Sequence, residues 1–162
     1  MFTGSYKGVT DVVTKYVWPA PALRVTRWCA ERGVTPNTVT WISLVLVLLA
    51  MAAFWHGWFL LGLAMAWGMT FLDTVDGKLA RVTLTSTRLG NIFDHGIDLV
   101  HPPFWYWAWI VGLDATGLPL IQAWLVLAVV VAGYVLQRVQ EGLFIALFKL
   151  EIHIWRRFDS WF

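Results

Sequence analysis

The chain has 162 residues, of which 59% are hydrophobic and only 14% are charged. Soluble domains carry about a quarter of charged residues, so this composition excludes an ordinary water-soluble globule. The twelve tryptophans agree, because indole rings favour the membrane interface. A net charge of +2 is too small to indicate a nucleic-acid partner, and the single cysteine, Cys29, excludes an intramolecular disulfide. The sequence therefore predicts an integral membrane protein that binds no nucleic acid.

The N-terminal segment, residues 1–34, is too charged to cross a membrane. After residue 10, apolar side chains recur on one side of a predicted helix, namely Val12, Val13, Tyr16 and Val17. This pattern is typical of an amphipathic helix that lies in the membrane interface on the cytoplasmic side. Pro19 and Pro21 are expected to interrupt that helix, because proline removes backbone hydrogen-bond donors.

The next stretch, residues 33–72, contains no charged side chain. It is about twice as long as one helix needs to cross a hydrocarbon core roughly 30 Å thick, so two spans must share it. A turn and a helix cap are predicted at the start of the first span, at Thr35, Pro36 and Asn37. The two spans are separated by a polar break at His56-Gly57. We expect the first span over residues 37–55 and the second over residues 58–72, continuing as a helix to about residue 81.

Two further spans are predicted, over residues 90–113 and 119–137, with the last helix extending as far as residue 148. The break between them is Asp114 with Gly117-Leu118-Pro119. Trp105, Trp107 and Trp109 are expected to form an interfacial aromatic belt. The predicted fold is an all-α polytopic transmembrane helical bundle with four spans in residues 35–148, preceded by the interfacial helix and followed by a polar, aromatic cytoplasmic tail, residues 149–162.

Charge distribution predicts the orientation of these spans. All twelve lysines and arginines lie before the first span, between the second and third, or after the fourth. The loops at His56-Gly57 and at residues 114–118 carry none. Because cytoplasmic loops are enriched in Lys and Arg, both termini and the loop around residues 81–90 are expected on the cytoplasmic side of a cytoplasmic (inner) membrane.

Four aspartates lie in or beside these otherwise apolar helices: Asp73, Asp76, Asp94 and Asp98. A charged residue at mid-membrane costs about 3 kcal/mol on insertion scales, so four of them need compensation. The i, i+3 and i, i+4 spacings place each pair on one face of its helix. Carboxylates facing one another would repel unless divalent cations bind, and an all-oxygen ligand set favours Mg²⁺ or Mn²⁺ over zinc.

Small residues accompany the acidic ones. Gly77 and Ala80 share a helix stripe with the first pair of aspartates, and Gly90 shares one with the second pair, so the two helices can approach closely. Arg81 lies nearer the predicted cytoplasmic mouth. Two metal ions with an arginine above them can offset the charge of a diphosphate, which indicates a phosphoryl-transfer site open to the cytosol.

The spacing of these residues resembles a known family signature. Residues 73–81 read DTVDGKLAR, residues 90–98 read GNIFDHGID, and eight residues separate them. They match without a gap the signature DxxDGxxAR(x8)GxxxDxxxD of the CDP-alcohol phosphotransferase (phosphatidyltransferase) family. Residues 35–40, TPNTVT, also resemble the stretch that opens the first span in that family, so the resemblance covers about residues 20–112.

The resemblance implies an enzyme that transfers a substituted phosphate from a CDP-alcohol to a hydroxyl acceptor and releases CMP. It implies two divalent metal ions, Mg²⁺ or Mn²⁺, held by aspartates. Asp73, Asp76 and Asp94 are then expected to hold the metals. Asp98 is expected to take the proton of the acceptor hydroxyl and is also a candidate metal ligand.

The same resemblance extends to the CDP-alcohol site. Arg81 is expected to stabilise the diphosphate, competing with a simple topology role for this cation. The remaining candidates for contact with the CDP-alcohol are Gly77, Ala80, Gly90, Asn37 and Thr40. Two residues have open alternatives: Arg138 either grips an acceptor phosphate or pairs with Glu141 one turn away, and His101 is either a hydrogen-bonded structural residue or a proton acceptor.

The motif leaves the substrates open. The expected donor is CDP-diacylglycerol with a polar acceptor from the cytosol, and the alternative is a CDP-linked small polar alcohol with a lipid hydroxyl as acceptor. A prenyltransferase and a non-catalytic metal-binding membrane protein are rivals from other classes.

The family usually has six transmembrane helices, so the chain either ends before two further spans, or is a short member, or has the missing wall supplied by a partner. Homodimerisation is left open.

Overall fold

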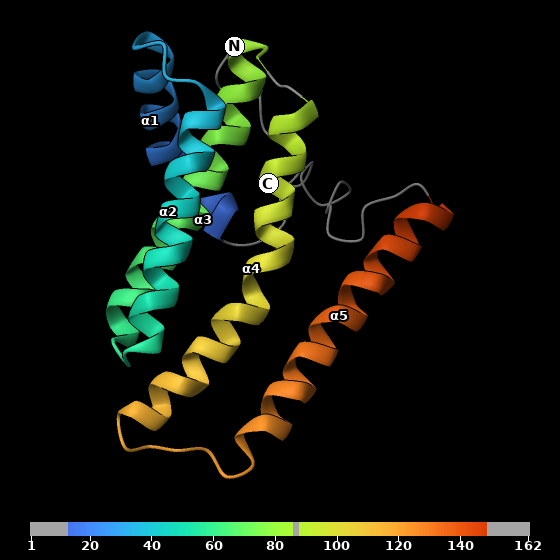
Figure 1. The fold of residues 1–162 in the computed structure, drawn as a ribbon. Helices are drawn as coiled ribbons and strands as arrows, with labels where there is room; N and C mark the ends of the chain where they lie inside the picture. Colours follow the sequence, from blue (N-terminus) through green and yellow to red (C-terminus); the bar gives the residue numbers. More distant parts are fainter. Residues whose placement is uncertain (1–12, 86–87, 149–162) are drawn as a thin grey trace.

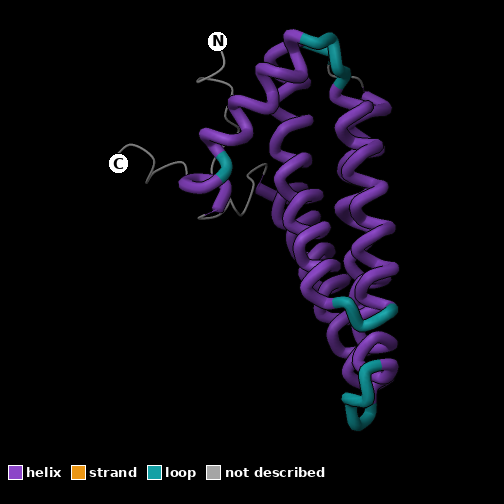
Figure 2. The backbone as a smooth tube through the Cα atoms, turned by 90° about the vertical axis from the view of Figure 1, so that its left-hand side faces the viewer, coloured by secondary structure: helices purple, strands orange, loops and turns teal. Residues whose placement is uncertain are grey.

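The computed structural model describes residues 13–85 and 88–148, and every regular element within these ranges is a helix. A short π-helix, η1 (Val13–Val17), precedes the α-helices α1 (Pro19–Glu31), α2 (Pro36–Trp55), α3 (Phe59–Thr83), α4 (Arg88–Ala115) and α5 (Ala123–Phe148). Helices α2, α3 and α4 lie side by side, α1 packs on α3, and α5 lies outside α4 (Figure 1). The predicted all-α helical bundle is confirmed, and Figure 2 shows only helices joined by loops and turns.

Three helices are long and apolar enough to cross a membrane, namely α2, α3 and α5. The sequence predicted four spans, and α4 is the one that does not meet this criterion in the described residues. With 28 residues it is long enough, at about 42 Å, but three aspartates, two prolines and two histidines lower its hydropathy. The crossing of α4 therefore stays a prediction, supported by its packing along α2.

Helix α1 packs against α3 through a stripe with one residue per turn. Ala22, Thr26 and Cys29 are buried, whereas Arg24 and Arg27 are exposed on the other faces. Ala22 and Cys29 join Val75 and Leu79 of α3 in one apolar cluster. Helix α1 is thus amphipathic, but the residues for which that pattern was predicted lie in η1, where Tyr16 and Val17 are exposed, or, for Val12, outside the described residues. An interfacial helix in this segment stays a prediction.

The prolines open α1 instead of interrupting a helix. Pro19 occupies the first position of α1 and Pro21 lies in the first turn, where a missing N–H costs no intrahelical hydrogen bond. The break in helical structure lies before them, at Trp18, which separates η1 from α1. The interruption expected at the proline pair therefore lies just before Pro19, and Pro21 does not break α1.

The turn and cap predicted before the first span are confirmed. Thr35 is the N-cap of α2, and its side-chain oxygen accepts a hydrogen bond of 3.2 Å from the backbone N–H of Thr38. Pro36 follows as the first helical residue. The turn between α2 and α3 is also confirmed, with Gly57 at a positive φ of 75°.

An aromatic cluster joins α2 to the far half of α4. The Phe54 ring lies 5.6 Å from that of Trp105 and 4.9 Å from that of Trp109, and Trp105 Nε1 donates to the Val47 carbonyl at 3.0 Å. Trp105 and Trp109 are four residues apart and share the helix face that meets α2. These two tryptophans therefore help to hold the bundle together, and their place in an interfacial belt stays a prediction.

Helix α4 changes direction around Pro102 and Pro103, as Figure 1 shows.

After α4, the chain forms a loop, and α5 begins at Ala123 instead of the expected residue 119. The reason is local: residues 118–120 are non-helical around Pro119, and Gln122 has a positive φ of 57°. No residue of α5 is buried in the part of the chain that the structure describes.

Candidate active site

Three of the four aspartates singled out from the sequence meet between α3 and α4. Asp73 and Asp76 project from α3, one turn apart, and Asp94 projects from α4. One carboxylate oxygen of each lies within 4.8 Å of those of the other two. Asp76 is buried and the other two side chains are half-buried. This arrangement brings together one oxygen from each of three carboxylates, the kind of donor that hard divalent cations prefer.

Asp76 carries the clearest sign that the cluster suits a cation. Its Oδ2 lies 2.8 Å from the hydroxyl oxygen of Thr40, which donates a buried hydrogen bond from α2. Its Oδ1 is buried and has no hydrogen-bond partner within the described ranges. Leaving a buried carboxylate oxygen unsatisfied is costly, and a metal ion would give that oxygen a partner. The residues present therefore fit a bound metal.

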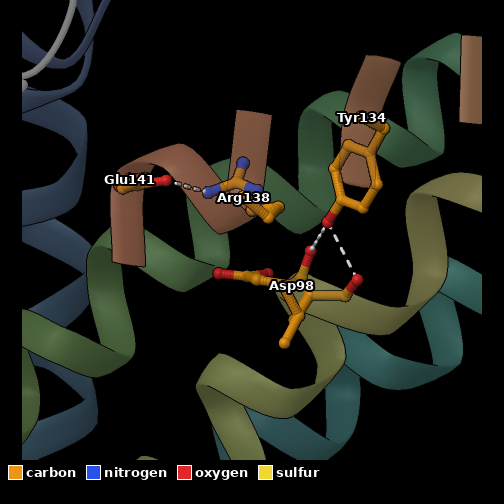
Figure 3. A network of polar contacts seen from close by, with 5 residues as sticks. Asp98, Tyr134, Arg138 and Glu141 are labelled. Atoms are coloured by element: carbon orange, nitrogen blue, oxygen red, sulfur yellow. Dashed lines mark hydrogen bonds and ion pairs between the residues drawn. The ribbon is translucent and has the colours of Figure 1, made fainter. Parts of the chain in front are cut away.

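Asp98 lies one turn beyond Asp94 on α4 and outside this group of three. Its side chain is exposed, and its charge interacts unfavourably with Asp73 and Asp94 and favourably with Arg138 of α5. Figure 3 shows Asp98 beneath Tyr134, Arg138 and Glu141, which all come from α5. The fourth aspartate is thus placed between the acidic cluster and a cation.

Arg138 makes two contacts within α5. Its Nη1 lies 2.8 Å from Glu141 Oε2, and its guanidinium carbon lies 5.3 Å from the centre of the Tyr134 ring. The pairing with Glu141 considered from the sequence is therefore present. The Arg138 side chain remains 43% exposed, so the ion pair leaves part of the guanidinium accessible beside Asp98.

The cytoplasmic end predicted for α3 holds Arg81, which is exposed. Its guanidinium folds back over Gly77, where an added Cβ would lie 3.5 Å from Nη1. Ala80 and Gly90 are half-buried, Gly90 in the first turn of α4. Helices α3 and α4 each pack on α2 and make little direct contact with each other, so the close approach expected from these small residues is not seen in the described ranges. Asn37 is exposed in the first turn of α2, and among the described residues no contact joins it to the aspartate cluster.

This chain was compared with known proteins. The family model described as CDP-alcohol phosphatidyltransferase matches residues 33–149, which include α2 to α5 and all the aspartates above. The chain belongs to the CDP-alcohol phosphatidyltransferase family. The first half of the family signature lies on α3 and the second half lies on α4. The aspartates of the two halves meet between these helices.

Several relatives of this phosphatidyltransferase chain carry functional names. It is 38% identical over 79 residues to the archaetidylinositol phosphate synthase of Pyrococcus horikoshii, covering 48% of this chain and 42% of that protein. It is 39% identical over 72 residues to human ethanolaminephosphotransferase 1, covering 40% and 17%. It is 37% identical over 82 residues to zebrafish (Danio rerio) cholinephosphotransferase 1, covering 44% and 22%. The chain spans less than half the length of these relatives.

Two histidines near the phosphatidyltransferase motif take different positions. His101 Nδ1 lies 2.8 Å from the Ile97 carbonyl, so this nitrogen carries the proton, and the ring packs on Trp105 at 4.4 Å. These contacts favour the structural alternative for His101. His95 was not considered from the sequence, yet its Nδ1 lies 3.7 Å from Asp94 Oδ2 at an exposed position. Its place within the motif, next to Asp94, was the available signal.

Tyr134 was also missed. Its hydroxyl donates to the Leu99 carbonyl at 2.8 Å and lies 3.4 Å from the Asp98 carbonyl. The signal in the sequence was its spacing, because Tyr134 and Arg138 are four residues apart and share a face of α5.

Proposed function

We propose that this chain is the catalytic part of a metal-dependent CDP-alcohol phosphotransferase that makes phospholipid and releases CMP. The observation that carries the proposal is the meeting of Asp73, Asp76 and Asp94 around the unpartnered Oδ1 of Asp76. Family membership and the relatives' names agree with this chemistry.

The acidic residues would divide their roles by position. Asp73, Asp76 and Asp94 would hold two divalent ions, Mg²⁺ or Mn²⁺, with Asp98 as a further candidate ligand. These ions would neutralise the charge of the diphosphate. Thr40 fixes one oxygen of Asp76 through its hydrogen bond, so the orientation of this carboxylate depends on α2.

The residues above the aspartates would bind the CDP-alcohol. Arg81 would pair with diphosphate oxygens, and its guanidinium lies over Gly77 of α3. Ala80 and Gly90 would let the nucleotide approach the backbones of α3 and α4. Asn37 and Thr40 stay candidates at the start of α2, with Thr40 supported by its contact with Asp76.

Asp98 and Arg138 would serve the acceptor. The Asp98 carboxylate would take the proton of the acceptor hydroxyl as that oxygen attacks the β-phosphate and CMP leaves. Arg138 would hold an anionic group of the acceptor, because its guanidinium is part-exposed beside Asp98.

This arrangement favours CDP-diacylglycerol as donor, with a polar, anionic acceptor that arrives from the cytosol. The alternative is a CDP-linked small polar alcohol with a lipid hydroxyl as acceptor. Both termini and the mouth of the site would face the cytoplasm. The proposal is consistent with the structure, in which the loops that lack Lys and Arg, after α2 and after α4, lie at one end of the bundle (Figure 1).

A product assay in lipid nanodiscs tests the proposal. Labelled CDP-diacylglycerol is supplied with a panel of polar alcohols and their phosphates, and CMP and lipid products are measured. We expect CMP release that requires Mg²⁺ or Mn²⁺ and stops in excess EDTA. Release of pyrophosphate from a prenyl diphosphate would indicate a prenyltransferase instead, and no metal-dependent product of either kind would indicate a non-catalytic metal-binding protein.

A further inference from the structure

The proline pair in α4 leaves two backbone carbonyls without their usual partners. In an α-helix, each N–H donates to the carbonyl four residues earlier. Pro102 and Pro103 have no N–H, so the carbonyls of Asp98 and Leu99 lose their helical donors. Such a loss is costly in a helix that runs through a membrane bundle, because water is not available to replace the donor.

A side chain from α5 takes the place of one of these donors and lies close to the second carbonyl. The Tyr134 hydroxyl donates to the Leu99 carbonyl at 2.8 Å and lies 3.4 Å from the Asp98 carbonyl (Figure 3). The carbonyls that this hydroxyl reaches are the two that the prolines release. The contact therefore joins α5 to α4 at the proline break, beside one of the proposed catalytic residues.

This anchor determines which α5 residue faces Asp98. Arg138 lies one turn after Tyr134 on the same face, with its guanidinium carbon 5.3 Å from the centre of the Tyr134 ring. Since no described residue of α5 is buried, apolar packing does little to set the position of this helix along α4. A directional hydrogen bond can set that position.

We propose that Tyr134 is a positioning residue: it donates to the Leu99 carbonyl released by Pro103, beside the Asp98 carbonyl released by Pro102, and thereby holds α5 so that Arg138 faces Asp98. The functional part of this inference rests on the proposed roles of Arg138 and Asp98 in acceptor binding. The structural part does not, because it concerns only the position of α5 against the rest of the bundle.

The position of α5 is measured with the full chain in nanodiscs. In a Cys29→Ala background, spin labels at the exposed positions Val45 of α2 and Val139 of α5 report the distance between the two helices. We expect one narrow distance distribution for this protein and a broader or shifted one for Tyr134→Phe. Tyr106→Phe is the matched control, since its ring lies 6.3 Å from that of Tyr134, and it should leave the distribution unchanged.

Restoring the backbone donors gives a second test. In a Pro102→Ala/Pro103→Ala background, the Asp98 and Leu99 carbonyls regain helical partners, so removing the Tyr134 hydroxyl should change the distance distribution much less than it does when the prolines are present. An unchanged distribution for Tyr134→Phe in the native background would overturn the proposal. An equal effect of Tyr134→Phe with and without the prolines would also overturn it.

Kinetics separate this proposal from the proposed function. CMP release from CDP-diacylglycerol is measured with inositol phosphate as the anionic acceptor probe. Tyr134→Phe should raise the KM of the acceptor about fivefold, the loss expected of one hydrogen bond, and leave the KM of CDP-diacylglycerol nearly unchanged. A changed helix distance with an unchanged acceptor KM would confirm the positioning of α5 and contradict the acceptor role of Arg138.

Discussion

Thr40 has one hydroxyl proton and two acceptors within reach, the Asp76 carboxylate at 2.8 Å and the Pro36 carbonyl at 3.2 Å. The shorter contact and the charge favour the carboxylate. Because the other oxygen of Asp76 has no hydrogen-bond partner among the described residues, this hydrogen bond from α2 helps to orient the Asp76 carboxylate.

We expect Thr40→Val to raise the Mg²⁺ concentration needed for half-maximal CMP release by about 10-fold or more, the range found for residues that orient metal ligands. Thr70→Val is the matched control, since that hydroxyl bonds only to the Ala66 carbonyl within the exposed face of α3. An unchanged metal requirement in Thr40→Val would show that Asp76 needs no support from α2.

Substitutions of Asp98 and Arg81 are predicted to impair different steps, turnover for Asp98 and CDP-alcohol binding for Arg81. Asp98→Asn keeps the shape and removes the basicity, so turnover should fall by about 100-fold or more while CDP-alcohol binding changes little. Arg81→Ala should weaken CDP-alcohol binding first. Titration of the labelled nucleotide and single-turnover kinetics measure both effects, with Asp114→Asn in the exposed end of α4 as control. Loss of nucleotide binding in Asp98→Asn would make Asp98 a metal ligand instead of a base.

Cys29 gives a pH-dependent prediction outside the spanning helices. Burial raises the pKa of the Cys29 thiol, and the thiolate is the form that reacts with maleimides. Since a raised pKa lowers the thiolate fraction at any given pH below it, labelling of the folded protein should be slow at neutral pH. It should become faster as the pH rises and should be rapid at neutral pH after unfolding in SDS. Rapid labelling of the folded protein would show that α1 leaves α3.

At the scale of elements, the contact between α2 and α4 depends on the absence of a side chain at Gly112. A Cβ at this position would overlap the Phe54 carbonyl, which belongs to the backbone of α2 and cannot turn away. The same close approach lets the Phe54 ring pack against Trp105 and Trp109.

Gly112→Ala should therefore destabilise the bundle by about 1–3 kcal/mol, the cost typical of overpacking. Thermal unfolding in detergent, followed by tryptophan fluorescence, measures the change. Gly133→Ala in α5 is the control, because a Cβ there meets nothing within 4 Å and alanine favours the helix. Equal stability of the two variants would mean that α4 can shift along α2 without loss of folding stability.

How far the sequence predicts these elements depends on the kind of signal. The ends of α2, α3 and α4 were predicted within about two residues, because caps, turns and loss of apolar character mark them. The start of α5 was misplaced because Pro119 reads equally well as a first helical residue or as part of a loop. The partners of Trp105 and Trp109 could not be predicted, since an inward tryptophan and an interfacial one look alike in a sequence.

The same contrast holds within the candidate site. Fixed spacing on two helices was enough to predict that Asp73, Asp76 and Asp94 converge. The contact between Thr40 and Asp76 spans 36 residues and depends on how α2 packs on α3, which no local pattern contains. Tyr134 was missed because its function depends on two prolines in another helix.

At the scale of the whole molecule, the distribution of Lys and Arg predicts which end of the bundle faces the cytoplasm. In a Cys29→Ala background, Leu118→Cys lies in the loop between α4 and α5 and Leu84→Cys lies after α3, both at exposed positions. A membrane-impermeant maleimide added to intact cells should label position 118 and leave position 84 unlabelled until the membrane is opened. The reverse pattern would invert the orientation and put the aspartate cluster on the outside.

The polarity of α4 has a consequence for the biogenesis of the protein. Three aspartates, two histidines and two prolines make this helix a poor substrate for insertion by itself, whereas α2, α3 and α5 are long and apolar enough to cross a membrane. Helix α4 is therefore expected to leave the translocon only when α2 and α3 are already beside it. These helices would then contact Trp105 and the aspartates of α4. Order of synthesis supplies those partners first, so a circular permutation that placed α4 ahead of α2 should yield a chain that fails at the translocon before it can fold.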